Sequence, residues 1–192
     1  IDEAIGSYES VLSFDSNHFD ACINLGNLFV DLGRFDDGIR KFEEANTINP
    51  KANRGLINLG NVHRRVGLAS KAKSYYNRAL GISAHDGLRI KSAFTLPVVY
   101  NNLSHINETR EQLKKNVIEL LEENLEVPNP SLETSTTNFL LAYQNENDRD
   151  LQRDIAQIHL NSCPRLGWTA KHCYKKRSSQ EKIKIGFLSA YF

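Results

Sequence analysis

The stretch Ile23-Asn24-Leu25-Gly26-Asn27 occurs a second time in the chain, as Ile57-Asn58-Leu59-Gly60-Asn61. The copies lie 34 residues apart, and the similarity continues at the same offset in the pairs Gly33 and Gly67, Phe42 and Tyr76, Ala45 and Ala79, and Ile48 and Ile82. A fixed period of this size is typical of stacked helical repeats. The repeated stretch therefore predicts a mainly α fold built as a solenoid.

Each repeat has the apolar spacing of two helices. In the first copy, residues 22, 25, 29 and 32 follow the three-and-four spacing of one helical stripe, and residues 35, 39, 42 and 45 follow it again. Gly33 and Gly67 fall between the stripes, where a residue that adopts positive φ lets the chain reverse. Small residues at Gly26 and Ala45 let neighbouring helices approach closely, and Pro50 cannot continue the second helix.

This pattern resembles the tetratricopeptide repeat, a helix-turn-helix unit of 34 residues. It departs from that repeat where a large aromatic residue is usual, because Cys22 and Leu56 stand there, and we expect Cys22 to be a small buried hydrophobe. We expect full repeats at residues 19–52 and 53–86, preceded by the second helix of a partial one. Repeats of this kind bind proteins and carry no chemistry of their own.

Composition limits the function further. The 192 residues are 40% hydrophobic and carry a formal net charge of +1, which gives no global field to attract nucleic acid. No apolar run approaches the roughly 20 residues that span a bilayer, so neither a nucleic-acid partner nor a membrane partner is expected. Three scattered cysteines form no disulfide framework, which favours a reducing compartment and a cytoplasmic location.

After the repeats, residues 87–181 read as a helical linker region. A long helix is expected after Ser104, with Ile106, Leu113, Val117, Leu120 and Leu121 on one face and Arg110 among the charged residues outside it. Residues 128–137 read as a loop, and the spacing does not decide the structure of residues 139–143. A further helix follows the caps Asn147 and Asp148, buries Leu151, Ile155 and Ile158, and ends at 163–164.

Two clusters in this region invite a functional interpretation. His159, Cys163, His172 and Cys173 are of types that bind zinc, but the second pair is adjacent and lacks the separation of ordinary zinc ligands, so no metal site is predicted. The basic residues Arg165, Lys171, Lys175, Lys176 and Arg177 favour a solvated linker, with a phosphate-binding patch as the alternative.

Residues 182–192 (KIKIGFLSAYF) change character. Charged and apolar residues alternate at the start of this stretch, and a continuous apolar run that ends in small residues follows. This pattern is typical of a buried parallel strand whose carboxyl end opens onto a ligand crevice. One strand cannot form a domain. We therefore expect the chain to stop at the first strand of a truncated α/β, Rossmann-like lobe, and repeats to precede Ile1.

Three segments taken together carry a more specific resemblance: residues 88–100 (LRIKSAFTLPVVY), 138–157 (NFLLAYQNENDRDLQRDIAQ) and 184–192 (KIGFLSAYF). They resemble the join between repeats and catalytic region in bacterial SPINDLY-like proteins, relatives of the O-linked N-acetylglucosamine transferases of glycosyltransferase family 41. The resemblance implies an intact protein that transfers N-acetylglucosamine from UDP-N-acetylglucosamine to Ser or Thr of proteins. The catalytic residues would lie beyond Phe192, so these 192 residues alone are expected to be inactive.

Asn24 and Asn58 are the candidate site residues. They occupy equivalent positions one period apart, and a carboxamide both donates to and accepts from an extended peptide backbone. In the transferase family, asparagines matching this position hold substrate polypeptide on the concave face. Two alternatives stay open: a family member that uses another nucleotide-sugar such as GDP-fucose, and a non-enzymatic tetratricopeptide adaptor.

Overall fold

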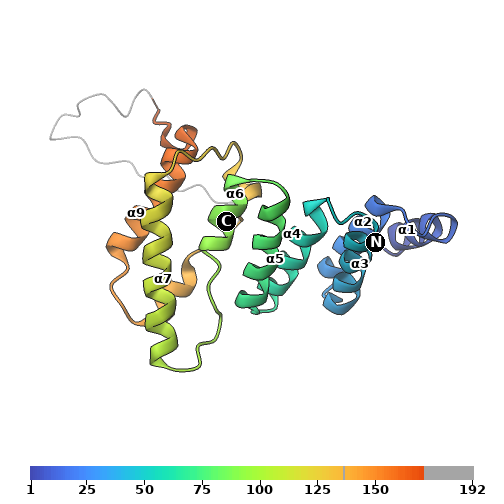
Figure 1. Cartoon of the computed structure of the whole chain (residues 1–192), viewed down its shortest axis with the longest axis horizontal. Coiled ribbons are helices and arrows are strands. Elements are labelled where there is room, and N and C mark those ends of the chain that lie inside the picture. The colour runs from blue at the N-terminus through green and yellow to red at the C-terminus, as the bar shows by residue number, and fades with distance from the viewer. Residues whose placement is uncertain (136, 171–192) are drawn as a thin grey trace, which may run out of the picture.

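The computed structural model of the chain describes residues 1–135 and 137–170, and within these residues the secondary structure is helical, with no strand. The predicted strand at 182–192, and the predicted basic residues from Lys171 onward, lie outside the described residues. Five helices form the array in Figure 1: α1 (Asp2–Phe14), α2 (Phe19–Asp31), α3 (Phe35–Ile48), α4 (Asn53–Arg65) and α5 (Ala69–Ile82). Consecutive helices pack against one another, as the sequence predicts for a solenoid of helix pairs.

Glycine sets both the turns and the packing distance of the repeats. Gly33 and Gly67 have φ of +76° and +85°, in the left-handed region where glycine avoids the strain of a side chain, and each ends the first helix of its repeat. Gly26 and Gly60 admit an aromatic ring against the backbone. A Cβ at Gly26 would lie 2.5 Å from Cε1 of Phe42, and one at Gly60 would overlap the ring of Tyr76.

The core of the array repeats with the same period. Phe42 and Tyr76, at equivalent positions, are 2% and 0% exposed, and Ala45 and Ala79 are fully buried beside them. Cys22 is buried in this cluster and carries a free thiol, whose pKa is raised by burial. The predicted role of Cys22 as a buried hydrophobe is therefore confirmed.

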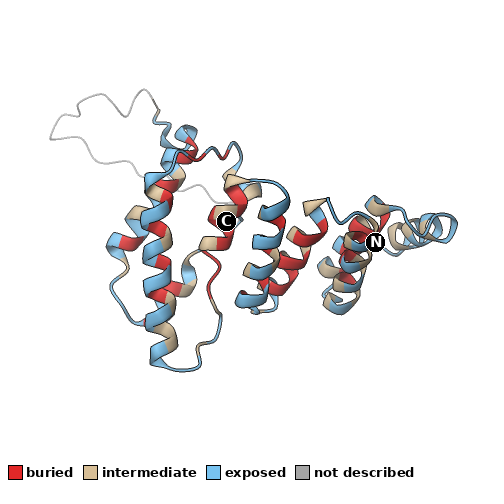
Figure 2. Ribbon diagram, viewed as in Figure 1, coloured by how far each residue is buried: buried red, intermediate tan, exposed pale blue. Residues whose placement is uncertain are grey.

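A second hydrophobic cluster lies beyond the array, in the unit formed by α6 (Asp86–Ala93), α7 (Leu103–Glu122), α8 (Pro130–Glu133), the 3₁₀ helix η1 (Phe139–Gln144), α9 (Arg149–Ser162) and η2 (Pro164–Gly167). Helix α6 belongs to both clusters, since Leu88 packs with the array and Ile90 and Phe94 pack with α7 and α9. Figure 2 shows α6 as a mostly buried helix between the two parts. This helix fixes the C-terminal unit to the end of the solenoid.

Most of the predicted helical faces in this unit are confirmed. Leu113, Val117 and Leu120 of α7 face Leu151, Ile155 and Ile158 of α9 in one core. The undecided run at 139–143 forms η1, which buries Leu141 and leaves Phe139 and Tyr143 exposed, with ring centroids 5.5 Å apart.

Arg110 corrects the predicted polar face of α7, because its side chain is buried rather than outside the core. It is 6% exposed, and its guanidinium donates to Gln144 Oε1 at 2.8 Å, to the Asn147 carbonyl at 3.2 Å and to Asp148 Oδ1 at 2.5 Å. A buried guanidinium needs such partners to offset its desolvation. These partners lie more than 30 residues away in sequence, so helical spacing within α7 could not reveal them.

Replacing Gly60 tests the close packing of the repeat. We expect Gly60→Ala to lower the free energy of unfolding by about 1–3 kcal/mol, because the added methyl group overlaps the buried Tyr76 ring. Gly6→Ala is the matched control: it lies in α1 with nothing within 4 Å of the new Cβ, so helix propensity favours alanine by up to about 1 kcal/mol. Urea denaturation measures both, and equal stability of the two variants would contradict the packing.

Arg110→Met tests the buried ion pair. We expect a loss of about 3 kcal/mol in the free energy of unfolding, since Asp148 and Gln144 lose their buried partner. Lys114→Met on the same helix removes only a solvent-exposed pair with Glu111 and should change stability by less than about 0.5 kcal/mol. If the two variants unfold at the same urea concentration, Arg110 is not a structural residue.

Candidate polypeptide-binding groove

A groove of about 370 Å³ runs along the first helices of the two full repeats and reaches α6. Helix α2 contributes Asn27 and Val30, α4 contributes Asn58, Asn61 and Arg64, and α6 contributes Lys91. Leu132 and Ser135, in and after α8, lie at the same groove, so the C-terminal unit supplies part of its wall. The walls therefore combine carboxamides, cations and apolar side chains.

The carboxamides form hydrogen bonds between different helices of the array. Asn58 Nδ2 donates to Asn27 Oδ1 at 3.2 Å, which joins the two repeats across the groove. Asn61, one period after Asn27, accepts from the Tyr76 hydroxyl at 2.9 Å, and Lys91 Nζ lies 3.5 Å from the same oxygen. The hydrogen bond between Asn27 and Asn58 is exposed to solvent, so hydrogen bonds from either side chain to a ligand can replace it.

The two predicted site residues have different surroundings. Asn58 lines the groove with its hydrogen-bond partner Asn27, whereas Asn24 is half-buried on α2 and is not among the lining residues. A ladder of Asn24 and Asn58 stays a prediction. Sequence reasoning missed Asn27 and Asn61 although the signal was present, because both copies of the repeated stretch end in asparagine at that position.

Two cations of the groove, the buried Lys91 and the half-buried Arg64, have no ion-pair partner in the described part of the chain. Lys91 is 5% exposed, and the ion pairs formed by lysines in the described part of the chain, those of Lys41, Lys114 and Lys115, do not include it. Burial, followed by the charge of Arg64, lowers the pKa of Lys91 to about 8. Arg64 Nε is also buried, without a hydrogen-bond partner in the described part of the chain. Burial raises the pKa of Tyr76, and the charge of Arg64 and a hydrogen bond between Arg64 and the Tyr76 hydroxyl oppose that rise.

Both cations stand at positions where the preceding repeat has an apolar residue. Lys91 falls one period after Ile57 and two periods after Ile23, and Arg64 falls one period after Val30. An isoleucine at the position of Lys91 would match the preceding repeats and avoid the desolvation of a charge. At these two positions the groove thus carries positive charges that the preceding repeat lacks.

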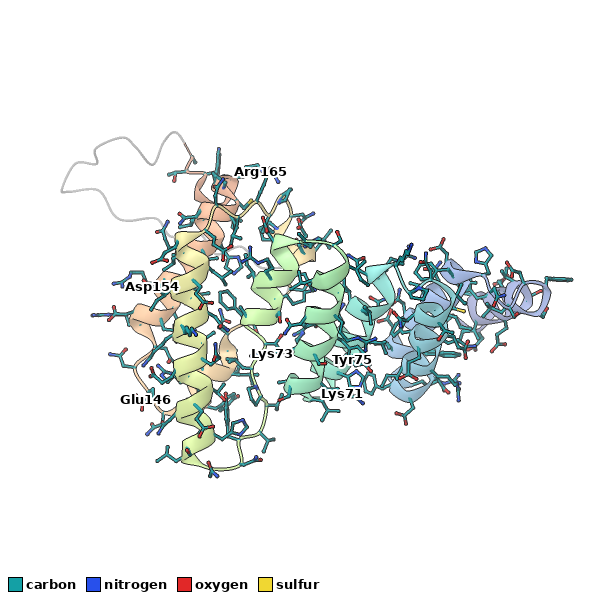
Figure 3. The ribbon with its side chains drawn as sticks, in the orientation of Figure 1. Lys71, Lys73, Tyr75, Glu146, Asp154 and Arg165 are labelled. Carbon is teal, nitrogen blue, oxygen red and sulfur yellow. The ribbon has the colours of Figure 1, made fainter. Side chains whose placement is uncertain are left out.

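Other hollows on the described surface contain acidic residues. Lys73 of α5 lines a hollow of about 340 Å³ toward α7 that also contains Glu119 and Glu123. Glu146 and Asp154 lie on the far side of the C-terminal unit from α5, as Figure 3 shows, in a hollow with the ion-paired Arg110. By contrast, no described residue that lines the groove is acidic.

Two of the four cysteine and histidine residues that could bind a metal, His159 and Cys163, lie in the described part of the chain. His159 is half-buried, with its ring centroid 6.1 Å from that of Phe94, and burial lowers its pKa. Cys163 is buried with a free thiol, while His172 and Cys173 lie outside the described residues. Within residues 1–135 and 137–170, no group of three or more potential ligands is brought together.

Comparison with known proteins supports the repeat. The sequence model of the tetratricopeptide repeat matches residues 19–51 and 54–86. Among solved structures, the crystal structure of MamA protein superimposes with a TM-score of 0.52 at 15% identity, covering 92% of this chain and 87% of that one. A search of curated protein sequences finds no match. The chain therefore contains tetratricopeptide repeats in a related helical fold. No helix in the described part is long and apolar enough to cross a membrane.

Lys91→Met tests the desolvated cation. A lysine whose pKa falls from 10.5 to about 8 on folding binds its proton more weakly in the native state, so it destabilises that state at neutral pH. The penalty disappears as pH rises from about 8 through 10.5, where the unfolded chain also loses the proton. We expect the variant to be more stable than wild type at pH 7 by about 1–3 kcal/mol, with the difference shrinking above pH 8.

Chemical denaturation of both proteins between pH 7 and 10.5 measures this difference. The difference between the free energies of unfolding of the two proteins at each pH cancels the titration of other groups, including Tyr76 and Lys73. A variant less stable than wild type at pH 7 would show that Lys91 has a stabilising partner.

Proposed function

We propose that the chain is a protein-interaction module that holds an extended segment of a partner polypeptide in the groove of its repeats. The observation that carries the proposal is the hydrogen bond from Asn58 to Asn27, which places two carboxamides from successive repeats side by side in the groove. An amide side chain offers a donor and an acceptor, so it pairs with a peptide unit whatever the side chains of that peptide.

The neighbouring residues suit the same ligand. Val30 and Leu132 give the groove apolar contact area, while Asn61 is oriented by the Tyr76 hydroxyl. Residues held in place before binding lose little conformational freedom when the ligand arrives. The protein would thus read the backbone of an extended segment through fixed amides and add affinity through apolar contacts.

Replacing Asn27 and Asn58 together by alanine tests the proposal. Each backbone hydrogen bond contributes about 0.5–1.5 kcal/mol, so the double variant should bind peptides roughly ten-fold more weakly. The peptides are selected on the whole 192-residue chain from a library of short unstructured sequences, and fluorescence anisotropy gives Kd. The control Gln157→Ala changes an exposed amide on α9 and should leave Kd unchanged.

Backbone N-methylation of the selected peptide provides the second arm of this test. The modification removes the N–H donors while keeping every side chain, so it should reduce affinity if amides read the backbone. Full binding of the methylated peptide, or unchanged Kd in the asparagine variant, would overturn the proposal.

A second candidate is that the module belongs to a protein O-glycosyltransferase and presents its substrates. Two of the segments that resemble that family support it: residues 88–100 and 138–157 contribute Ile90, Phe94, Leu141 and Ile155 to a single core. On this proposal the donor is UDP-N-acetylglucosamine, and transfer requires residues beyond this chain. Incubating the 192-residue chain and its extended gene product with labelled UDP-N-acetylglucosamine, then GDP-fucose, tests it. If the extended protein transfers label from neither donor, only the proposal of a protein-interaction module remains.

A further inference from the structure

We propose that the hollow between α7 and α9 is a docking surface for a basic amphipathic helix of a partner protein. The hollow has a volume of about 310 Å³, and it lies on the side of the C-terminal unit that faces away from α5, where Figure 3 labels Glu146 and Asp154. None of the residues that line the repeat groove lines this hollow. The proposal therefore goes beyond the binding of an extended segment by the repeats.

The floor of the hollow is apolar, and an apolar side chain beside it is open to solvent. Val117 of α7 and Leu151 of α9 form the floor and are 2% and 8% exposed. Ile118 also lines the hollow but is 59% exposed, although its neighbours on the exposed face of α7, at positions 114, 115, 119 and 122, are charged. Burying Ile118 against an apolar side chain of a partner would remove this area from water, which favours binding.

Acidic side chains follow the α9 side of the hollow. Asp150 and Asp154 are one helical turn apart on α9, and Glu146 precedes the helix by the same sequence interval. Both aspartates pair only with arginines of their own helix, Arg149 and Arg153, whose side chains are 83% and 68% exposed. Such exposed pairs contribute little stability, so a cation of a ligand can replace the arginines.

The cations that line the hollow are already neutralised. Arg110 donates to Asp148 Oδ1 at 2.5 Å, and Lys114 Nζ lies 2.7 Å from Glu111 Oε1. Neither of these two carboxylates lines the hollow. The charge that the lining offers to a ligand is therefore negative, and it selects a partner with lysine or arginine beside its apolar side chain.

A helix fits this surface better than an extended segment does. Cations four residues apart on a helix lie about 6 Å apart along its axis, which is the spacing of Asp150 and Asp154 on α9. The same helical face also presents the residues three positions from each cation, so apolar side chains can stand between the cations and reach Ile118. In an extended segment, cations at every second position would occupy the whole face, and the apolar residues would point away.

The probe is a fluorescein-labelled helical peptide with lysine at every fourth position, leucine three positions after each lysine, and alanine and glutamine elsewhere. Fluorescence anisotropy with the whole chain gives Kd. Replacing Asp150 and Asp154 together by asparagine should weaken binding roughly three- to twenty-fold, because each exposed ion pair contributes a few-fold. Ile118→Gln should weaken it by a similar factor, because the apolar contact is lost.

Matched variants act as controls for charge and for apolar area. Glu9→Gln combined with Glu122→Gln removes the same charge from two exposed positions outside the hollow. Leu103→Gln removes an apolar side chain that is 69% exposed at the start of α7. Neither variant should change Kd, and Asn27→Ala combined with Asn58→Ala should not change it either, which separates this surface from the repeat groove.

Exchanging the charges distinguishes lost contacts from lost folding. A peptide with glutamate in place of each lysine should not bind the wild-type chain. It should bind the variant that combines Asp150→Lys with Asp154→Lys, because the ion pairs are restored with opposite signs.

Four results would overturn the proposal. The first is that the wild-type chain does not bind the lysine peptide, or binds it no more tightly than the Asp150 and Asp154 variant does. The second is equal affinity for a peptide of the same composition in which lysine and leucine alternate. The third is dimerisation of the wild-type chain in sedimentation that Ile118→Gln abolishes, which would assign the surface to a second copy. The fourth is binding that begins only after Lys175 and Lys176 are replaced by glutamine, which would assign the hollow to the chain's own basic residues.

Discussion

The contact between Tyr76 and the backbone at Gly60 is the constraint on which the second repeat and the groove depend. The ring lies where any Cβ at Gly60 would be, which sets the distance between α4 and α5. Its hydroxyl reaches Asn61 Oδ1, and the same oxygen faces Lys91 on α6. One buried side chain therefore links the packing of the repeat to the orientation of an amide in the groove.

The first repeat has the same ring-to-glycine packing but lacks the hydroxyl group. Phe42 fills the position of Tyr76 against Gly26, but it has no hydroxyl to hold Asn27. Asn27 instead accepts from Asn58 of the next repeat. Two copies of the same five-residue stretch thus give an amide pair near α2 and an amide beside cations near α6, which makes the groove chemically different at its two ends.

The periodic part of this account could be predicted from sequence because each inference used residues close together or one period apart. The turns at Gly33 and Gly67, the buried pair Phe42 and Tyr76, and the faces of α7 and α9 follow from local spacing. The partners of Arg110 depend on how η1 and the start of α9 return to α7, which no helical period contains. Lys91 could not be recognised as a groove residue because it lies past the last recognisable repeat, and Arg64 because the spacing within α4 does not show that its Nε is buried.

An NMR titration with the selected peptide tests the central claim most directly, that the groove between the repeats is the binding surface. The whole chain is labelled with ¹⁵N, and the side-chain amide signals of Asn27, Asn58 and Asn61 are followed along with the backbone. We predict that these side-chain signals and the backbone of α4 and α6 shift together, with one Kd. Shifts confined to α7 and α9, with the three asparagine side chains unmoved, would contradict the account.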